Sequence, residues 1–196
     1  MNPLQYLPPE YRLAWSIDLA KNGKHMLALN LAGLVLLVPA FWLFGRLIVL
    51  VRGVSAWNVP GDESLLFMLL ILAGYALTLI VHEGFHGLFF WLYTRSRPVF
   101  ALKWSYAYAA APGWFIPKRQ YWLIGLAPLI GVSLLGVLLL PFLPLTWLLA
   151  WLVAVASNVA GAVGDMYVVL KLAFAPEDTL VNDRGDAIAF YQRSAV

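Results

Sequence analysis

The stretch LLFMLLILAGYALTLIVHEGFHGLFFWLY, residues 65–93, decides the fold of this chain. It contains no lysine or arginine, and it is longer than the roughly 18 apolar residues that a helix needs to cross the hydrocarbon core of a bilayer. The whole sequence of 196 residues has the same bias, with 62% hydrophobic and only 12% charged residues. Because a soluble domain holds about 25% charged residues, the composition predicts a polytopic membrane protein.

Three further windows are long and apolar, and polar or turn-forming segments separate them. The four predicted spans are residues 27–44 (or to 51), 65–93, 120–140 and 146–174. The predicted fold class is an all-α polytopic membrane protein with about four transmembrane helices. We expect one integral-membrane domain with three parts: an amphipathic amino-terminal segment (1–26), a four-span core (27–174) and a soluble cytoplasmic tail (175–196). The acidic residues of the tail are expected to be solvated; they are Glu177, Asp178, Asp183 and Asp186.

The amino-terminal segment contains EYRLAWSIDLAKNGK, residues 10–24. Leu13, Ile17 and Ala20 recur at helical intervals, and prolines followed by a glutamate precede them, which is typical of a helix start. The pattern predicts a short amphipathic helix on the membrane surface. The alternative is a disordered tail.

The loop between the second and third spans, residues 99–118, reads VFALKWSYAYAAAPGWFIPK. Large side chains stand at every second position of its first half, namely Leu102, Trp104, Tyr106 and Tyr108. This alternation is typical of a strand, and Ala-Pro-Gly at 111–113 favours a turn before a second short run. The loop therefore predicts a β-hairpin or a re-entrant loop that dips into the membrane.

Basic residues are distributed unequally between the two sides of the predicted membrane. With four spans, eleven of the 13 lysines and arginines fall on the side of both termini, and only Arg46 and Arg52 fall on the other. The positive-inside rule then places both termini in the cytoplasm, in a multi-pass protein of the cell (inner) membrane. The formal charge of +3 includes no basic run, so the expected surroundings are membrane lipid and not nucleic acid. The oligomeric state has no signature in the sequence.

The second span contains the motif His82-Glu83-Gly84-Phe85-His86, which has the form H-E-x-x-H. Residues i and i+4 share one face of a helix, so both imidazoles can reach a single ion. Glu83 points about 100° round the helix, toward an open coordination position. Ionisable groups inside a span cost about 2.5–3.5 kcal/mol each, so three together indicate a functional site. The motif predicts a zinc site in which Glu83 is the general base.

A hydrolytic zinc site needs a third protein ligand, and the composition limits which residues could be that ligand. The chain has no cysteine, and His25 lies outside the spans, where we interpret it as an interfacial residue. Of the ten acidic residues only Glu83 and Asp165 fall within predicted spans, and Glu83 is the expected base. Asp165 is therefore predicted, by elimination, to be the third ligand beside His82 and His86.

Depth in the membrane supports this assignment. His82 lies 17 residues after Leu65 and Asp165 lies 19 after Thr146, or about 26 and 29 Å along parallel spans. Asn158 precedes Asp165 by seven residues and shares its face of the helix. We interpret Asn158 as a catalytic group that binds the substrate or a developing oxyanion, with an interhelical hydrogen bond as the alternative.

These residues resemble the catalytic motifs of site-2-protease-type intramembrane metalloproteases, which pair HExxH on one transmembrane helix with an aspartate on a later one. The matching residues are His82, Glu83, His86 and Asp165, with Asn158 upstream. The chain is still more similar to small bacterial proteins grouped as putative zincin peptidases, and that similarity includes the GLAP stretch at 125–128. The resemblance implies proteolysis within or near the bilayer.

Together the motif and the resemblance predict a zinc-dependent, membrane-embedded endopeptidase that cleaves a peptide or transmembrane-protein substrate near the cytoplasmic face. The alternative is a non-catalytic metal-binding membrane protein, such as a metal transporter or sensor. A transporter needs a continuous polar path, and the first and third spans hold almost no polar residues that would line one.

Overall fold

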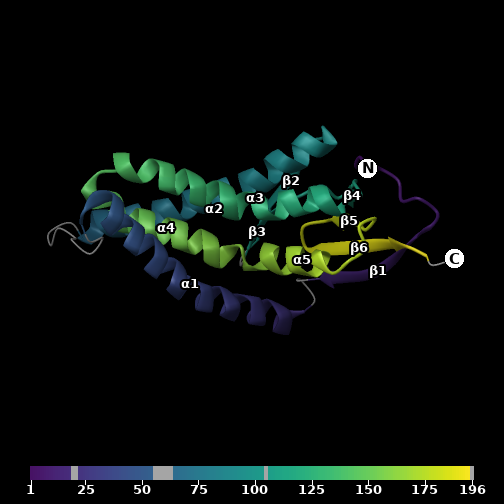
Figure 1. Ribbon diagram of the computed structural model, residues 1–196, viewed down its shortest axis with the longest axis horizontal. Helices are drawn as coiled ribbons and strands as arrows, with labels where there is room; N and C mark the ends of the chain where they lie inside the picture. Colours follow the sequence, from purple (N-terminus) through teal and green to yellow (C-terminus); the bar gives the residue numbers. More distant parts are fainter. Residues whose placement is uncertain (19–21, 55–63, 104–105, 195–196) are drawn as a thin grey trace. The chain divides into compact units, whose positions relative to one another are not determined.

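The computed structural model describes residues 1–18, 22–54, 64–103 and 106–194 of the chain (Figure 1). Ala20, Lys21 and Trp104, which entered the sequence-based predictions, lie outside these residues. Within the described part, four helical segments are long and apolar enough to cross a membrane: Gly23–Arg52, Met68–Thr94, Lys118–Phe142 and Leu145–Ala173. The predicted number and positions of the spans are confirmed as far as helix length and apolar composition show, while the orientation in the membrane stays a prediction.

The spans are built from five α-helices and two short 3-10 turns. The helices are α1 (Gly23–Arg52), α2 (Ser64–Thr94), α3 (Lys118–Leu139), α4 (Leu148–Gly161) and α5 (Val163–Ala173). The turns η1 (Leu140–Phe142) and η2 (Leu145–Trp147) join α3 to α4. The fourth predicted span is thus two helices in series, which meet at Ala162.

The outward surface of these helices is apolar. On α1, the side chains of Leu34, Val35, Val38 and Trp42 are 61–71% exposed. A soluble protein rarely leaves so continuous an apolar surface in water. These side chains therefore have the chemistry of a surface that faces lipid.

The chain divides into two compact units, each built from several segments. One unit contains residues 29–82 and 128–163 and, in its described part, consists of helices. Its core gathers Phe44, Ile48 and Leu152. Small residues let its helices pack closely, because a Cβ on Gly33 would lie only 2.8 Å from the carbonyl oxygen of Ala160.

The other unit contains residues 1–28, 83–127 and 164–196 and includes all the strands. An antiparallel sheet of four strands has the order β1-β6-β5-β4, with β1 Tyr11–Asp18, β6 Ala187–Arg193, β5 Leu180–Asp183 and β4 Ile116–Pro117. Strands β2 (Val99–Leu102) and β3 (Ala107–Ala110) form a separate hairpin. The core of this unit includes Phe90, Ile116, Leu172 and Phe190. The class is therefore mixed and mostly helical, where the sequence predicted all-α.

The predicted amino-terminal amphipathic helix is wrong, because residues 11–18 form strand β1. The strand pairs with β6 along its whole length, with a register shift between Leu13 and Trp15. Tyr11 and Ile17 are buried, and Trp15 stacks on Phe190 with ring centroids 3.5 Å apart. The apolar residues fit both periodicities, and the distant partner strand decides between them by supplying backbone hydrogen bonds.

The predicted hairpin after the second span is present, with its turn in a different place. Lys103 donates its backbone N–H to the carbonyl of Tyr106 (2.8 Å), and Leu102 pairs with Ala107, so β2 and β3 are the two strands of the hairpin. The segment 111–113 instead leads into β4, which pairs with β5. The second short run therefore joins the four-stranded sheet and not the hairpin.

The tail is not a solvated extension, because residues 180–183 and 187–193 are strands of the sheet. Asp183 is 6% exposed; its carboxylate accepts hydrogen bonds from the Tyr121 hydroxyl and from the backbone N–H of Gly185 (2.8 Å). Burial raises the pKa of Asp183. The other acidic residues of the tail form pairs at the surface: Glu177 with Lys118 (3.1 Å), Asp178 with Arg193 (3.5 Å) and Asp186 with Tyr106 (2.5 Å).

Candidate metal centre

Helix α2 carries His82, Glu83 and His86 in one turn. Both histidines are 8% exposed, and Glu83 is half-buried. Helix periodicity alone places the two imidazoles on one face, because four residues turn the chain by about 400°. The preceding and following turns are mostly apolar, so the two imidazoles lie in apolar surroundings.

The ring of His86 is held by a backbone carbonyl. Its Nδ1–H donates to the carbonyl oxygen of Ile124 on α3 (3.0 Å). A carbonyl can only accept, so Nδ1 must carry the proton, and Nε2 carries the lone pair in the neutral ring. That Nε2 lies 3.3 Å from Oδ1 of Asp165 in the first turn of α5. A lone pair and a carboxylate oxygen attract each other only through a shared cation, which is a proton or a metal ion.

Pro128 explains why the Ile124 carbonyl is available. In a helix this carbonyl would accept the N–H of the residue four positions later, which is Pro128 and has no N–H. The proline thus leaves the Ile124 oxygen to the His86 ring. The GLAP stretch at 125–128 had this signal in the sequence, since a proline inside a span releases the carbonyl of the residue at i−4.

His82 is oriented through a side-chain amide. Asn158 on α4 donates from Nδ2 to the carbonyl of Pro128 (3.4 Å), which fixes which end of the amide is oxygen. Its Oδ1 therefore accepts from Nδ1–H of His82 (2.9 Å). In His82, as in His86, Nε2 is then the nitrogen with the lone pair. Metal-binding histidines in proteins are oriented in this way by a partner of the other ring nitrogen.

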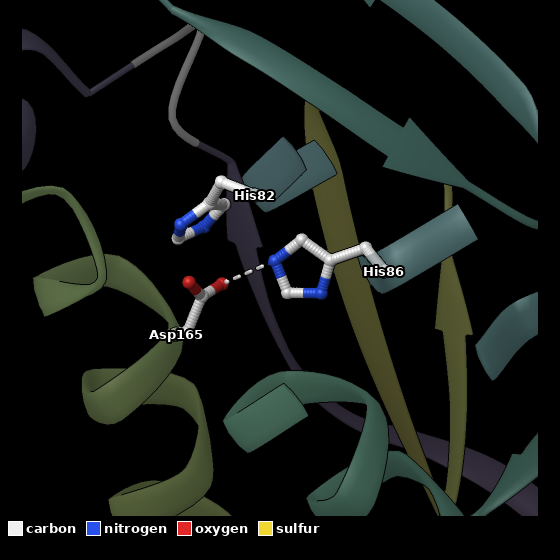
Figure 2. A group of neighbouring side chains, drawn as sticks. All are labelled: His82, His86 and Asp165. Atoms are coloured by element: carbon white, nitrogen blue, oxygen red, sulfur yellow. Dashed lines mark ion pairs between the residues drawn. The ribbon is translucent and has the colours of Figure 1, made fainter. Parts of the chain in front are cut away.

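The ligand atoms of His82, His86 and Asp165 all lie within 4.8 Å of one another, and Figure 2 shows the three side chains pointing toward a common centre. Zinc binds nitrogen and oxygen at about 2.0–2.1 Å, so two ligands of a tetrahedral site stand about 3.3 Å apart. The separation between His86 Nε2 and Asp165 Oδ1 matches that value. Two imidazoles and one carboxylate also match the donor set of hydrolytic zinc sites, which leave one position for water or substrate.

The remaining residues singled out in the sequence fall in different places. Asn158 is 2% exposed and contacts His82, so the structure places it behind a candidate ligand, and its role toward a substrate stays a prediction. His25 stands apart from the metal group and packs edge-on against Tyr167 (5.1 Å). The catalytic role of Glu83 and the three ligand assignments also stay predictions.

The hairpin approaches α2 beside this centre. A Cβ on Gly87 would collide with the ring of Phe100 on β2, so only glycine permits the contact one residue after His86. Sequence reasoning did not identify this role of Gly87. The contact between Gly87 and Phe100 places the hairpin of β2 and β3 next to the candidate ligand His86.

Comparison with known families gives a match over the middle of the chain. The model of a family described as "putative zincin peptidase" covers residues 75–180, more than half of the chain and every candidate residue of the metal centre. No curated protein and no solved structure matches the chain. The resemblance to site-2-type proteases therefore stays a prediction.

Proposed function

The chain belongs to the putative zincin peptidase family, and on that premise we propose that it is a zinc-dependent endopeptidase embedded in the membrane. The observation that carries the proposal is the 3.3 Å approach of His86 Nε2 to the Asp165 carboxylate, with the His86 ring held by Ile124. His82 supplies the second nitrogen from the same turn of α2. The proposed metal ligands are thus His82, His86 and Asp165.

Zinc held by His82, His86 and Asp165 would supply a Lewis acid, which lowers the pKa of water toward about 7. Glu83, adjacent to His82 on α2, accepts the proton of the attacking water and delivers it to the leaving amine. Ile124 and Asn158 hold the two imidazoles in the tautomer that keeps Nε2 a ligand. The apolar surroundings of α2 limit water, which strengthens these electrostatic interactions.

The depth of the centre supports cleavage close to one membrane face. His86 lies eight residues before the end of its span at Thr94, and Asp165 lies eight residues before the end of its span at Ala173. Both are therefore about 12 Å along the helix from the same face. The excess of basic residues makes this face the cytoplasmic one in our proposal.

The substrate class we propose is an extended segment of a membrane-associated peptide or protein. A protease site binds its substrate as extended backbone, and a hairpin edge can pair with such a segment as an added strand. The contact between Phe100 and Gly87 supports this role, because it places β2 beside the turn of α2 that carries His86.

The direct test is Glu83→Gln in the purified protein, with zinc content and cleavage of a membrane-peptide library measured together. We expect zinc to stay stoichiometric, because Glu83 is not a proposed ligand, and cleavage to fall by at least a hundredfold. His86→Ala is the matched control and should lose both zinc and cleavage. Full activity of Glu83→Gln would refute the mechanism. Zinc flux into liposomes without any proteolysis would favour the transporter alternative.

A further inference from the structure

A cavity lies in the unit that contains the sheet, and none of its lining residues is a candidate metal ligand. Its volume is about 490 Å³, within the range of about 300–1,000 Å³ that is typical of small-molecule sites. Strand β1, the beginning of α1 and the end of α5 line it. The lining residues that matter here are Trp15, Asp18, Asn22, His25, Tyr167 and Lys171.

One wall of the cavity holds a cluster of nitrogen donors around an aromatic ring. The Lys171 ammonium lies over the ring of Tyr167 (5.6 Å from its centroid), and His25 packs against the same ring edge-on (5.1 Å). Among the described residues, no carboxylate forms an ion pair with Lys171. The side chain of Asn22 accepts the backbone N–H of His25 (3.1 Å), which leaves its amide nitrogen as a further donor. This wall can bind an anion.

Apolar side chains also line the cavity, among them Trp15 and Phe174. Trp15 is held by its stacking on Phe190, and Phe174, which follows α5, is 85% exposed. The cavity therefore combines anion-binding groups with an apolar edge. Asp18 also lines it.

The position of the cavity along the spans indicates where such a ligand would come from. The first candidate span begins at Gly23 and the last ends at Ala173, and the cavity is lined by residues on both sides of these points. It therefore lies at the level where helices leave the hydrocarbon core. Lysine and aromatic side chains at this level contact lipid head groups.

We propose that this cavity binds the head group of one membrane phospholipid, with the phosphate held by Lys171 and His25 and the acyl chains leaving past Phe174. Because Tyr167 follows Asp165 by two residues, the bound lipid contacts the helix that carries the third candidate zinc ligand.

The test measures the thermal unfolding midpoint of the full-length protein in detergent as phosphatidylethanolamine is added. A ligand that binds only the folded state raises this midpoint in proportion to RT ln(1 + [L]/Kd). We expect a saturable rise in the wild type and a shift at least halved in Lys171→Met. Lys24→Met is the matched control: it removes the same charge from an exposed residue that does not line the cavity, and its shift should equal that of the wild type.

Three further samples identify the source of the phosphate and protect the test against misfolding. Diacylglycerol, which has no phosphate, should give no saturable shift, and inorganic phosphate should not reproduce the shift. His25→Gln should reduce the lipid-dependent shift independently if Lys171→Met does not fold. Equal shifts in Lys171→Met and Lys24→Met, or an equal shift with diacylglycerol, would overturn the proposal. An equal shift with inorganic phosphate would make the ligand a soluble anion and overturn it as well.

Discussion

Replacing Pro128 by alanine should weaken zinc binding while stabilising helix α3. Metal affinity and protein stability usually change in the same direction, and this replacement should change them in opposite directions. Alanine at 128 restores a backbone N–H, which would bond to the Ile124 carbonyl and compete with Nδ1–H of His86. A net hydrogen bond is worth about 0.5–1.5 kcal/mol, and changes behind a metal ligand typically cost about 10–100-fold in metal affinity. We therefore expect zinc affinity to fall about tenfold. Proline in a helix interior costs about 3 kcal/mol relative to alanine, so unfolding should not become easier.

The assay is competition between the protein and a chromophoric chelator for zinc, with thermal unfolding of the zinc-free protein measured in parallel. Pro39→Ala is the matched control, because Pro39 also lies inside a long apolar helix, α1, whereas the candidate ligands are on α2 and α5. That variant should gain helix stability and keep its zinc affinity. Unchanged zinc affinity in Pro128→Ala, or an equal loss in both variants, would show that the Ile124 carbonyl does not orient His86.

Two further predictions concern the unit that contains the sheet. Gly87→Ala should cost about 1–3 kcal/mol of stability, because its methyl group displaces the ring of Phe100; adding Phe100→Ala should restore part of this loss in a double-mutant cycle followed by chemical unfolding. Asp183→Asn should stabilise the protein near pH 7. Burial raises the pKa of Asp183 in the folded state above its unfolded value of about 3.9. The contribution of Asp183 to the free energy of unfolding is therefore complete below the unfolded pKa and is lost as the pH rises through the folded pKa. Between pH 4 and pH 8 the free energy of unfolding should therefore fall less steeply for Asp183→Asn than for the wild type. An equal pH dependence in the two proteins would contradict this account.

The candidate ligands were accessible to sequence reasoning because each depends on local geometry. His82 and His86 share a face of α2 through the period of the helix, whatever surrounds them. Asp165 followed from the scarcity of carboxylates within apolar spans, where an ionisable group is costly. The structure brings its carboxylate to 3.3 Å from His86.

The groups that hold these ligands were much harder to predict. The sequence indicates either a substrate contact or an interhelical hydrogen bond for Asn158, and the structure shows a hydrogen bond to His82, 76 residues earlier. The partner of His86 is a backbone carbonyl, which every residue has, so only the proline at 128 distinguishes Ile124 in the sequence. Hydrogen bonds of this kind depend on which helices become neighbours, and hydropathy does not encode that.

The sequence by itself determined the four helices that are long and apolar enough to span a membrane, and it determined the histidine pair, since apolar length and helical period act over one or a few turns. Only the tertiary structure decided that residues 11–18 are a strand and that Asp183 is buried. Tyr11 pairs with Arg193 at the other end of the chain, and Asp183 meets Tyr121 at the start of the third span. For such segments the local preferences of helix and strand are nearly balanced. The distant partner then settles the conformation, because it supplies the backbone hydrogen bonds and the apolar contacts that neither segment has alone.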